Sequence, residues 1–429
     1  MAPIPPADYL IVGGGTAGLV RAARLSEDPE ASVVVQESGP DRTSDPRIQN
    51  PLGFMALAGS GLDWKPQVVP QAELNNRVLD HPAGKLLGGS SAIDSLLLAP
   101  PSPAGSMPLG FPGNEDNGLI KTVQPALVGE ERTVGVRPFT ATIDPVSGNR
   151  SSADSTYGAV AATRPNVTIV TEATVRTFST GVEVAWNDSV ITVEARKELI
   201  LAAGVFHTPK LLELSGIGDK EELQSLSIPV LLHNPGVGEN LQNHVMAVIP
   251  VPLKDTPALS TIQPGIEAVS FTRLDLAVLL TEDTRGPKPA KQVIVVMLCC
   301  PFSRGTVHIT SSDPCIPPTV DLGVFSNPLD IEILARHVQA TQNLLRSIAF
   351  EQFTQLHESM TSAAHHACGT AAMLPRQDVG VVGQDLKVHG TRNLRIVDAC
   401  CFPLISCANP MGAVYGVAER AVDVIRGVV

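Results

Sequence analysis

Aromatic side chains are scarce in this sequence. Of the 429 residues, 4% are aromatic, with two Trp and three Tyr. Aliphatic side chains must therefore form most of the core, and a platform on which bases or sugars stack is disfavoured. Apolar residues still make up 43% of the chain, which is typical of a globular protein, and the length suggests two or three domain-sized units.

The chain also has no run of basic residues. Its 31 Lys and Arg stand against 43 Asp and Glu, which gives a net charge of −12. Nucleic acids and anionic membrane surfaces attract positively charged patches. Both are therefore disfavoured as partners.

Targeting and membrane signals are missing as well. The N-terminus, MAPIPPADYLIVGGG, lacks a charged segment followed by a long apolar stretch and a cleavage site, and no run of 18 apolar residues occurs. The seven cysteines have a spacing that matches no zinc motif, so no metal site is predicted. Reduced, buried thiols and a cytoplasmic location are the expectation.

The first 36 residues have the pattern of a strand, a turn, a helix and a second strand. Residues 9–12 form a short apolar run, residues 19–25 have helical character, and residues 32–36 are β-rich. Two strands joined in this way pair in parallel, which predicts an α/β fold. Further β-rich runs lie at 166–170, 175–178, 182–186, 189–194, 198–203 and 292–300, and helical patterns at 207–214, 330–346 and 411–425.

Three glycines, Gly13, Gly15 and Gly18, lie between the first strand and the helix with the spacing G-x-G-x-x-G. The first permits a tight turn, the second lets the backbone approach a pyrophosphate, and the third allows the helix to pack closely on the strand. The helix N-terminus, with Thr16 and Ala17, attracts phosphates through its partial positive charge. The pattern predicts a dinucleotide site, with a glycine-rich turn that binds no ligand as the alternative.

An acidic residue, Glu37, follows the second strand, 24 residues after Gly13. A carboxylate at that point accepts hydrogen bonds from the ribose of an adenosine. It would repel a 2′-phosphate, which argues against NADP.

A second glycine cluster reads GKLLGGSSAID at residues 84–94. Successive glycines and serines expose backbone N–H groups and hydroxyls, which suits an anion or the edge of a flavin. Taken alone, an ordinary Gly/Ser loop is the simpler explanation of this segment.

This second cluster resembles the first signature of the glucose–methanol–choline (GMC) family of flavoenzymes. Further segments resemble the family in its own order along nearly the whole chain. They are GVFHTPKLLELSGIG at 204–218, PGVGENLQNH at 235–244, SRGTV at 303–307, NPLD at 327–330, HACGT at 366–370, NLRIVDA at 393–399 and NP at 409–410. Asn243 stands where the family usually has Asp.

The resemblance implies two domains. A Rossmann-type FAD-binding domain would be assembled from residues 1–99, 150–245 and 366–429. An α+β substrate domain with an antiparallel sheet would comprise residues 100–149 and 246–365. The interval between the two signatures is short for the family, so we expect a shortened substrate domain without its lid. A homodimer is one way in which the site could then be covered.

The resemblance also implies a reaction, in which an alcohol is oxidised by hydride transfer to N5 of the flavin. Oxygen or another acceptor would then reoxidise the reduced flavin. His366 matches the family's catalytic histidine, and a neutral imidazole can take the hydroxyl proton as the hydride leaves. Asn409 matches the partner position and can hydrogen-bond the substrate oxygen. The alternative for His366 is a buried core histidine. We expect a small, apolar substrate, because no polar sugar-binding stretch occurs.

Other residues are implied to contact FAD. They are Gly84, Leu87, Gly89, Ser90, Asp94, Val175, Asp398, Ala399, Asn409, Pro410 and Met411. Asp398 and Ala399 would lie near the pyrophosphate and the ribityl chain, and the backbone of Val175 would meet the adenine. A helix that starts near Met411 would stabilise the negative charge of reduced flavin with its N-terminus.

Two positions depart from the family pattern. Some members attach FAD covalently through a histidine where this chain has Ile93, so noncovalent FAD is expected. Asp94 replaces an asparagine. A carboxylate there would make the anionic reduced flavin more costly to form unless it is protonated or paired.

Two other functions stay open, because a fold does not determine a function. Some relatives of the family keep FAD but catalyse a redox-neutral cyclisation or elimination, in which His366 would act as an acid or base. The third possibility is a noncatalytic flavoprotein whose shortened substrate domain binds a partner.

Overall fold

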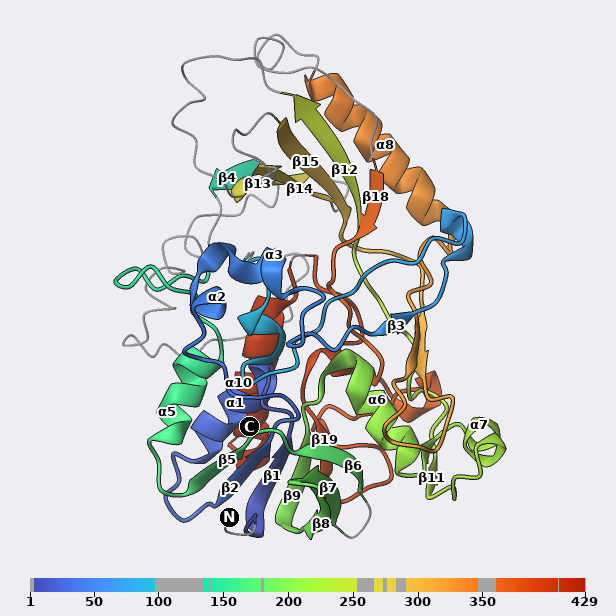
Figure 1. Cartoon of the computed structure of the whole chain (residues 1–429). Helices are drawn as coiled ribbons and strands as arrows, with labels where there is room; N and C mark the ends of the chain where they lie inside the picture. Colours follow the sequence, from blue (N-terminus) through green and yellow to red (C-terminus); the bar gives the residue numbers. More distant parts are fainter. Residues whose placement is uncertain are drawn as a thin grey trace.

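The computed structural model describes residues 4–96, 135–138, 141–178, 181–252, 266–272, 276–282, 291–345, 360–407 and 409–428. Figure 1 shows a parallel sheet in the half of the molecule where both termini lie, and an antiparallel sheet at the opposite end. Most of the 100–149 segment that was assigned to the substrate domain lies outside the described residues.

Five parallel strands form the first sheet. In the order in which they pair, they are β19 (Leu394–Ile396), β9 (Ala195–Leu201), β1 (Ala7–Val12), β2 (Val33–Gln36) and β5 (Val167–Val170). Helix α1 (Thr16–Leu25) connects β1 to β2. Every residue of β2 is buried, as expected for a strand that is covered on both faces. The predicted Rossmann-type fold is therefore confirmed.

A three-stranded antiparallel sheet lies in the chain between β5 and β9. Its strands are β6 (Thr174–Phe178), β7 (Val182–Trp186) and β8 (Ser189–Val193). All three agree with the β-rich runs of the sequence to within one or two residues.

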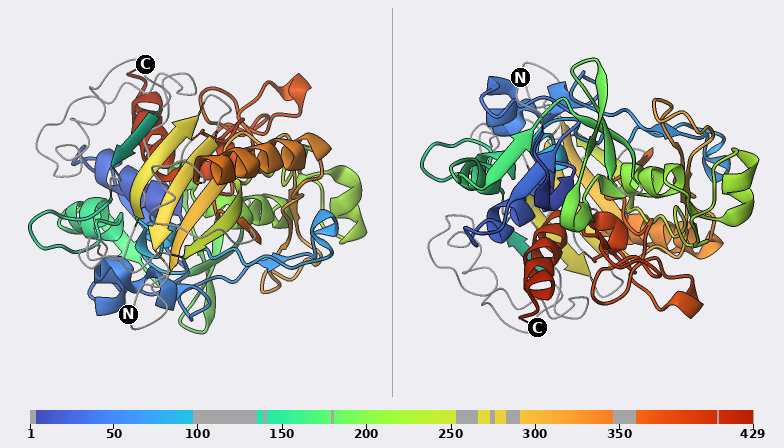
Figure 2. Two further views of the ribbon diagram at one scale, coloured as in Figure 1. Left: turned by 90° about the horizontal axis from the view of Figure 1, so that it is seen from above. Right: turned by 90° about the horizontal axis from the view of Figure 1, so that it is seen from below.

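The second large sheet is antiparallel. Its strands, in order, are β18 (Met360–Ala363), β12 (Val245–Pro252), β15 (Lys291–Leu298), β14 (Leu276–Glu282), β13 (Ile266–Thr272) and β4 (Gly135–Pro138). Helix α8 (Pro328–Leu345) contacts β12 and β15, and Figure 2 shows it lying across the sheet. The antiparallel sheet that the family resemblance implied is thereby confirmed.

Side chains alternate between the two faces of this sheet, as the pleat of a strand requires. Ala247 and Ile249 of β12 pack in one apolar cluster with Leu334 of α8. Met246 and Val248, one residue out of phase, line a cavity on the other face. The sheet therefore has one face for the core and one for a ligand.

The remaining elements connect these layers. The helices are α6 (Gly204–Leu214), α7 (Lys220–Ser225), α10 (Met411–Arg426), α2 (Pro46–Gln49), α3 (Phe54–Leu57) and α5 (Ala159–Ala162). The short strands are β3 (Gln67–Val68), β16 (Thr306–His308) and β17 (Thr319–Asp321), which form one sheet, and β10 (Ile217–Gly218) with β11 (Leu232–His233). Helix α10 packs against α1 and ends at Gly427 in the left-handed conformation.

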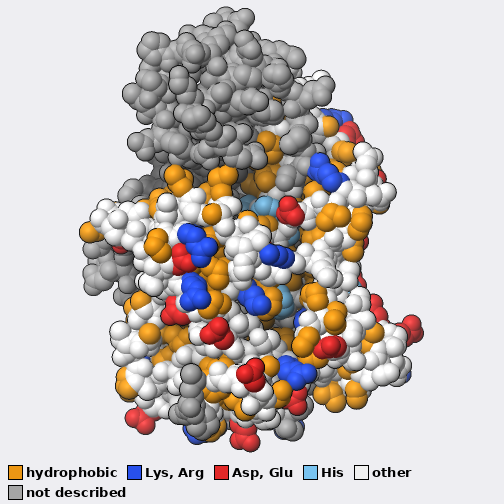
Figure 3. All heavy atoms as spheres, in the orientation of Figure 1, with side chains coloured by type: hydrophobic (Ala, Val, Ile, Leu, Met, Phe, Trp, Pro, Cys, Tyr) orange, Lys and Arg blue, Asp and Glu red, His pale blue; other side chains and the backbone are white. Residues whose placement is uncertain are grey.

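Among the helices that the structure describes, none is both long and apolar enough to cross a bilayer. On the face drawn in Figure 3, Lys and Arg side chains are interspersed with Asp and Glu side chains.

Candidate active site

A cavity of about 1680 Å³ extends between the two large sheets. Its wall contains Gly13 and Glu37, which follow β1 and β2, and Met246 and Met297, which belong to β12 and β15. In open parallel sheets, ligands bind beyond the carboxyl ends of the strands. The cavity therefore joins the predicted dinucleotide loop to the ligand face of the antiparallel sheet.

The glycine loop after β1 has the shape that its spacing predicts. Gly13 has a φ of +104°, and a Cβ atom added to Gly18 would lie 1.9 Å from the carbonyl oxygen of Gly13. Around Gly15 there is more room, because the nearest atom to an added Cβ would be the Cα of Gly89 at 3.7 Å. Gly15, Thr16 and Ala17 line the cavity at the N-terminus of α1.

Glu37 is buried beside this loop. Its carboxylate accepts hydrogen bonds from the backbone N–H groups of Gly14 and Gly39, both at 2.8 Å. Burial raises the pKa of Glu37 to about 7, and these backbone donors oppose the rise. Each carboxylate oxygen keeps a second lone pair. The predicted contact with a ribose stays a prediction, and the structure adds that Glu37 orders the loop itself.

The second glycine cluster packs directly on the first. The N–H of Gly88 donates to the carbonyl oxygen of Gly14 at 2.8 Å. A Cβ added to Gly89 would lie 2.8 Å from the Cα of Gly15. Two segments that are separate in the sequence thus form one wall. The predicted residues of this cluster that line the cavity are Gly84, Gly89, Ser90 and Asp94.

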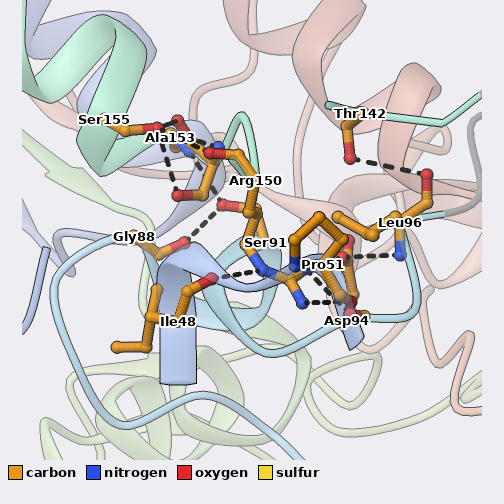
Figure 4. A network of polar contacts seen from close by, with 11 residues as sticks. Ile48, Pro51, Gly88, Ser91, Asp94, Leu96, Thr142, Arg150, Ala153 and Ser155 are labelled. Carbon is orange, nitrogen blue, oxygen red and sulfur yellow. Dashed lines mark hydrogen bonds and ion pairs between the residues drawn. The ribbon is translucent and has the colours of Figure 1, made fainter. Parts of the chain in front are cut away.

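Asp94 is paired with a buried arginine that sequence reasoning missed. The guanidinium of Arg150 donates to the Asp94 carboxylate at 2.7 Å and to the Asp94 carbonyl oxygen at 2.8 Å, and its Nε donates to the carbonyl oxygen of Ile48 at 3.0 Å (Figure 4). Burial raises the pKa of Asp94 to about 6, and the charge of Arg150 opposes the rise. Asp94 therefore has the partner that a carboxylate beside a flavin would need.

His366 lies on the cavity wall between two other side chains. Its Nδ1 is 2.8 Å from Nδ1 of His244, and its Nε2 is 3.0 Å from Nδ2 of Asn409. The other nitrogen of His244, Nε2, is 3.0 Å from the carbonyl oxygen of Ser406. The backbone N–H of His366 donates to Oδ1 of Asn243 at 2.8 Å. The structure therefore brings together the two predicted catalytic side chains.

These contacts determine which ring nitrogens carry protons. The carbonyl oxygen of Ser406 can only accept, so Nε2 of His244 carries a proton and, in the neutral ring, Nδ1 is an acceptor. Nδ1 of His366 must then donate to His244. This leaves a lone pair on Nε2 of His366, which accepts from the Asn409 amide. His244 is part of the motif at 235–244, but its sequence position predicted no role for it.

Burial keeps both imidazoles neutral. It lowers the pKa of His244 to about 4 and the pKa of His366 well below its ordinary value. The neighbouring rings of His244 and His365 lower the pKa of His366 further. A neutral imidazole is the form that can act as a base.

Sequence reasoning also missed His81, a buried residue of the cavity wall. Its ring packs edge-on against Phe206 and His365, with centroid distances of 4.9 and 5.4 Å. Neither ring nitrogen hydrogen-bonds a side chain among the described residues, although the backbone of His81 and Pro82 lies close to the ring. Burial lowers the pKa of His81 to about 3. An unpartnered polar side chain on a cavity wall is a candidate contact for a polar group of a ligand.

Asp398 fixes the chain near the start of α6. Its carboxylate accepts from the N–H of Gly204 at 2.9 Å, from Oγ1 of Thr208 at 2.8 Å and from the N–H of Cys400 at 2.8 Å. The other predicted cofactor residues that line the cavity are Val175, Asp398, Ala399, Asn409, Pro410 and Met411.

Two residues predicted to contact the cofactor, Gly18 and Leu87, are not among those that line the cavity. Leu87 is buried in a cluster with Leu19 and Tyr415. Gly18 packs on Gly13, in keeping with the packing role that its position predicted. Both residues therefore lie behind the wall.

Away from the cavity, His308 lies among three glutamates. Its Nδ1 is 2.7 Å from Glu213 and 3.3 Å from Glu222, and its Nε2 is 3.1 Å from Glu239. Ligand atoms of Glu213, Glu222 and His308 lie within 4.8 Å of one another, a spacing that a metal ion could use. The ion pairs by themselves account for these contacts.

Comparisons with known proteins place the chain in a family. Models described as GMC oxidoreductase match residues 112–246 and 301–418. The chain is 30% identical over 570 residues to the GMC oxidoreductase family protein Mala s 12 of Malassezia sympodialis, with 98% of this chain and 92% of that protein covered. It is 28% identical over 533 residues to an oxygen-dependent choline dehydrogenase of Citrobacter koseri, with 98% and 95% covered.

The fold agrees with these matches. The structure of pyridoxine 4-oxidase from Mesorbium loti superposes with a TM-score of 0.84 at 24% identity, and 98% of this chain and 99% of that chain are covered. The alignment with Mala s 12 extends over 570 residues, whereas this chain has 429, in accord with a shortened form. The chain therefore belongs to the GMC oxidoreductase family, whose enzymes bind FAD.

Proposed function

We propose that this chain oxidises an alcohol group of a small, apolar substrate with noncovalently bound FAD. The observation that carries the proposal is the contact of His366 with His244 and Asn409 on the wall of the cavity that also contains the glycine loop, from which we infer a lone pair on Nε2 of His366. A base in that place can remove a hydroxyl proton while the hydride leaves carbon. When bound, FAD supplies the acceptor for that hydride.

The residues around the glycine loop fit a dinucleotide. The backbone at Gly15 is open toward the cavity, and the N-terminus of α1 offers N–H groups to phosphates. Glu37 retains lone pairs for ribose hydroxyls. Ile93, at the position of covalent attachment in some relatives, has no nucleophilic atom, which supports noncovalent binding.

His366 and Asn409 would hold the reacting hydroxyl together. A hydroxyl both donates and accepts, so it can replace the direct 3.0 Å contact between Asn409 Nδ2 and His366 Nε2. It would donate to Nε2 and accept from the amide of Asn409. After His366 has taken the proton, its Nδ1–H continues to donate to His244, which stabilises the imidazolium.

The cavity wall supports an apolar substrate. Met246, Val248, Val295 and Met297 of the antiparallel sheet contribute apolar surface. His81 is the one point at which we propose that a second polar group of the substrate binds. Choline is an alcohol, so the relative from Citrobacter koseri supports an alcohol donor and, by its name, oxygen as acceptor.

The test is an absorbance spectrum of the FAD-loaded protein, recorded without oxygen before and after addition of each member of a panel of apolar alcohols. We expect one alcohol class to bleach the flavin bands while the corresponding aldehyde or ketone forms. Flavin that stays oxidised while a compound is converted to an isomer or a dehydrated product would replace this proposal with the redox-neutral one. Protein that cannot be loaded with FAD would refute the proposed cofactor.

A further inference from the structure

Two cysteine side chains from distant parts of the chain meet beside the candidate active site. Sγ of Cys300, which follows β15, lies 2.8 Å from Sγ of Cys407, which precedes α10. Both side chains are partly exposed, which differs from the expectation that the thiols are buried. The other cysteines are the buried Cys299, Cys368, Cys400 and Cys401 and the exposed Cys315.

The contact between the two sulfurs is close to bonding distance. A disulfide bond is about 2.0 Å long, so the Sγ atoms of Cys300 and Cys407 need to approach by only about 0.8 Å. The two residues are 107 positions apart in the sequence. A bond between them would therefore join segments that only the fold brings together.

The pair packs on the ligand face of the antiparallel sheet, beside the cavity wall. Cys300 and Cys407 pack against Val295 and Met297, which line the cavity. Cys407 also adjoins Ser406, whose carbonyl oxygen accepts from His244. Two residues further on is Asn409, which contacts His366. A bond that fixes Cys407 would therefore also limit the movement of Ser406 and Asn409, which contact His244 and His366.

We propose that Cys300 and Cys407 form a reversible disulfide when the protein meets hydrogen peroxide, and that this bond restrains the segment carrying Ser406 and Asn409. Their partial exposure allows a small oxidant to reach the sulfurs.

The chemistry needs only the two thiols and the peroxide. One thiol loses its proton and the thiolate attacks a peroxide oxygen, the O–O bond breaks to give a sulfenic acid, and the hydroxide that leaves takes up a proton to form water. The second thiol then attacks the sulfur of the sulfenic acid, the S–S bond forms, and the S–O bond breaks to release a second water. Two thiols are oxidised by two electrons in total, and one hydrogen peroxide is reduced to two waters. A dithiol reductant reverses the bond formation by exchange.

The test uses the full-length, FAD-loaded protein, exposed to added hydrogen peroxide, quenched, alkylated and digested for mass spectrometry. We expect a peptide pair linked through Cys300 and Cys407 that disappears after treatment with dithiothreitol. Hydrogen exchange of the backbone amides at 405–407 and 409 should slow by about fivefold or more in the oxidised protein, because their opening is restrained.

Matched variants separate this pair from general oxidation. Cys315→Ser removes the exposed thiol and should keep both effects, whereas Cys300→Ser and Cys407→Ser should each lose both. Cys300→Ala repeats the test without a hydroxyl. Alkylated Cys300 and Cys407 in protein whose Cys315 is oxidised would overturn the disulfide. A linked peptide with unchanged exchange at 405–407 and 409 would overturn the restraint. Because the peroxide is added, neither outcome depends on the proposed alcohol oxidation.

Discussion

At the scale of single residues, the base that we propose, His366, depends on a carbonyl oxygen that it does not touch. Ser406 fixes the proton on Nε2 of His244, His244 accepts from Nδ1 of His366, and Nε2 of His366 is left to act as a base. Each step follows from what a carbonyl or a neutral imidazole can donate or accept. Loss of His366 would therefore remove the proposed base itself, whereas loss of His244 would remove the group that fixes the tautomer of His366.

Replacement of His366 by alanine should lower turnover by about 10²-fold or more, because positioned proton transfer contributes on the order of 10²–10⁴-fold. The FAD content should not change, since the glycine loop is untouched. The rate of flavin reduction by substrate and the flavin absorbance per chain measure the two quantities. His365→Ala, next to it on the same wall, is the matched control and should have the smaller effect. Near-normal turnover of His366→Ala would remove this residue from the mechanism.

Replacement of His244 by phenylalanine should also slow flavin reduction, although His244 is one side chain further from the substrate. Without an acceptor next to Nδ1, His366 can carry its proton on Nε2 and so lose the basic lone pair there. In a catalytic triad, loss of the residue that fixes the tautomer lowers the turnover rate by up to about 10⁴-fold. His244→Gln keeps an amide oxygen as acceptor and should recover part of the rate at similar KM. Equal losses in the two variants would instead indicate a packing role for His244.

At the scale of elements, two glycine-rich segments form one wall of the cavity. They are the loop that follows β1 and the cluster at 84–94, and they can pack closely because glycines lie where the two segments meet. The N–H of Gly88 donates to Gly14, and Gly89 faces Gly15. The room that is left at Gly15 opens into the cavity. That space is where we propose that the pyrophosphate of FAD lies.

Gly15→Val should therefore yield protein without flavin, because the new side chain would occupy the space of the pyrophosphate. Flavin absorbance per chain after purification in excess FAD measures the loss. Gly61→Val is a suitable control, since nothing lies within 4 Å of a Cβ at Gly61 and the cavity is not affected. Fully loaded Gly15→Val protein would contradict the proposed cofactor loop.

His308 of β16 forms ion pairs with a glutamate of α6, a glutamate of α7 and Glu239. Burial lowers its pKa, but the hydrogen bonds to Glu213 of α6 and Glu239, together with the charge of Glu222 of α7, outweigh burial and raise the pKa to about 10. Because the folded state binds the proton more tightly, this stabilisation is fully present below the ordinary histidine pKa of 6.5 and is lost as the pH rises toward 10.

Thermal unfolding of His308→Gln measures this contribution. The variant should have a lower Tm than the parent protein near pH 6, and the difference should shrink as the pH approaches 10. A difference that is the same throughout this range would show that the imidazole contributes packing and not charge. Arg336→Gln, which removes an exposed ion pair with Glu332, is the control and should change Tm little.

At the scale of the whole molecule, local patterns predicted some of the elements, and long-range contacts formed the site. The β-rich run at 292–300 became β15 (Lys291–Leu298), and the helical pattern at 330–346 became α8 (Pro328–Leu345). Strand β12 contains Pro250 and Pro252, which count against a strand, and it was not predicted. The proposed domain boundaries stay a prediction.

The contacts that complete the site could not be read from periodicity. Arg150 is 56 positions from Asp94, and His244 is 122 positions from His366. Neither pair has a local signal, because only the packing of distant segments brings their side chains together. The family motifs pointed to His366 and Asn409, which the structure brings together on the cavity wall, because those motifs preserve the result of such packing in a short stretch of sequence.

FAD should stabilise the whole molecule, because the proposed site is assembled from segments near residues 13, 89, 175 and 398. A ligand at about 1,000 times its Kd adds about 4 kcal/mol to the free energy of unfolding. The Tm of the apoprotein should therefore rise by several degrees when FAD is added, as differential scanning fluorimetry can measure. NADP should produce no such rise, because Glu37 would face its 2′-phosphate. Gly15→Val should not respond to FAD, so a response of that variant would show that the stabilising ligand binds elsewhere.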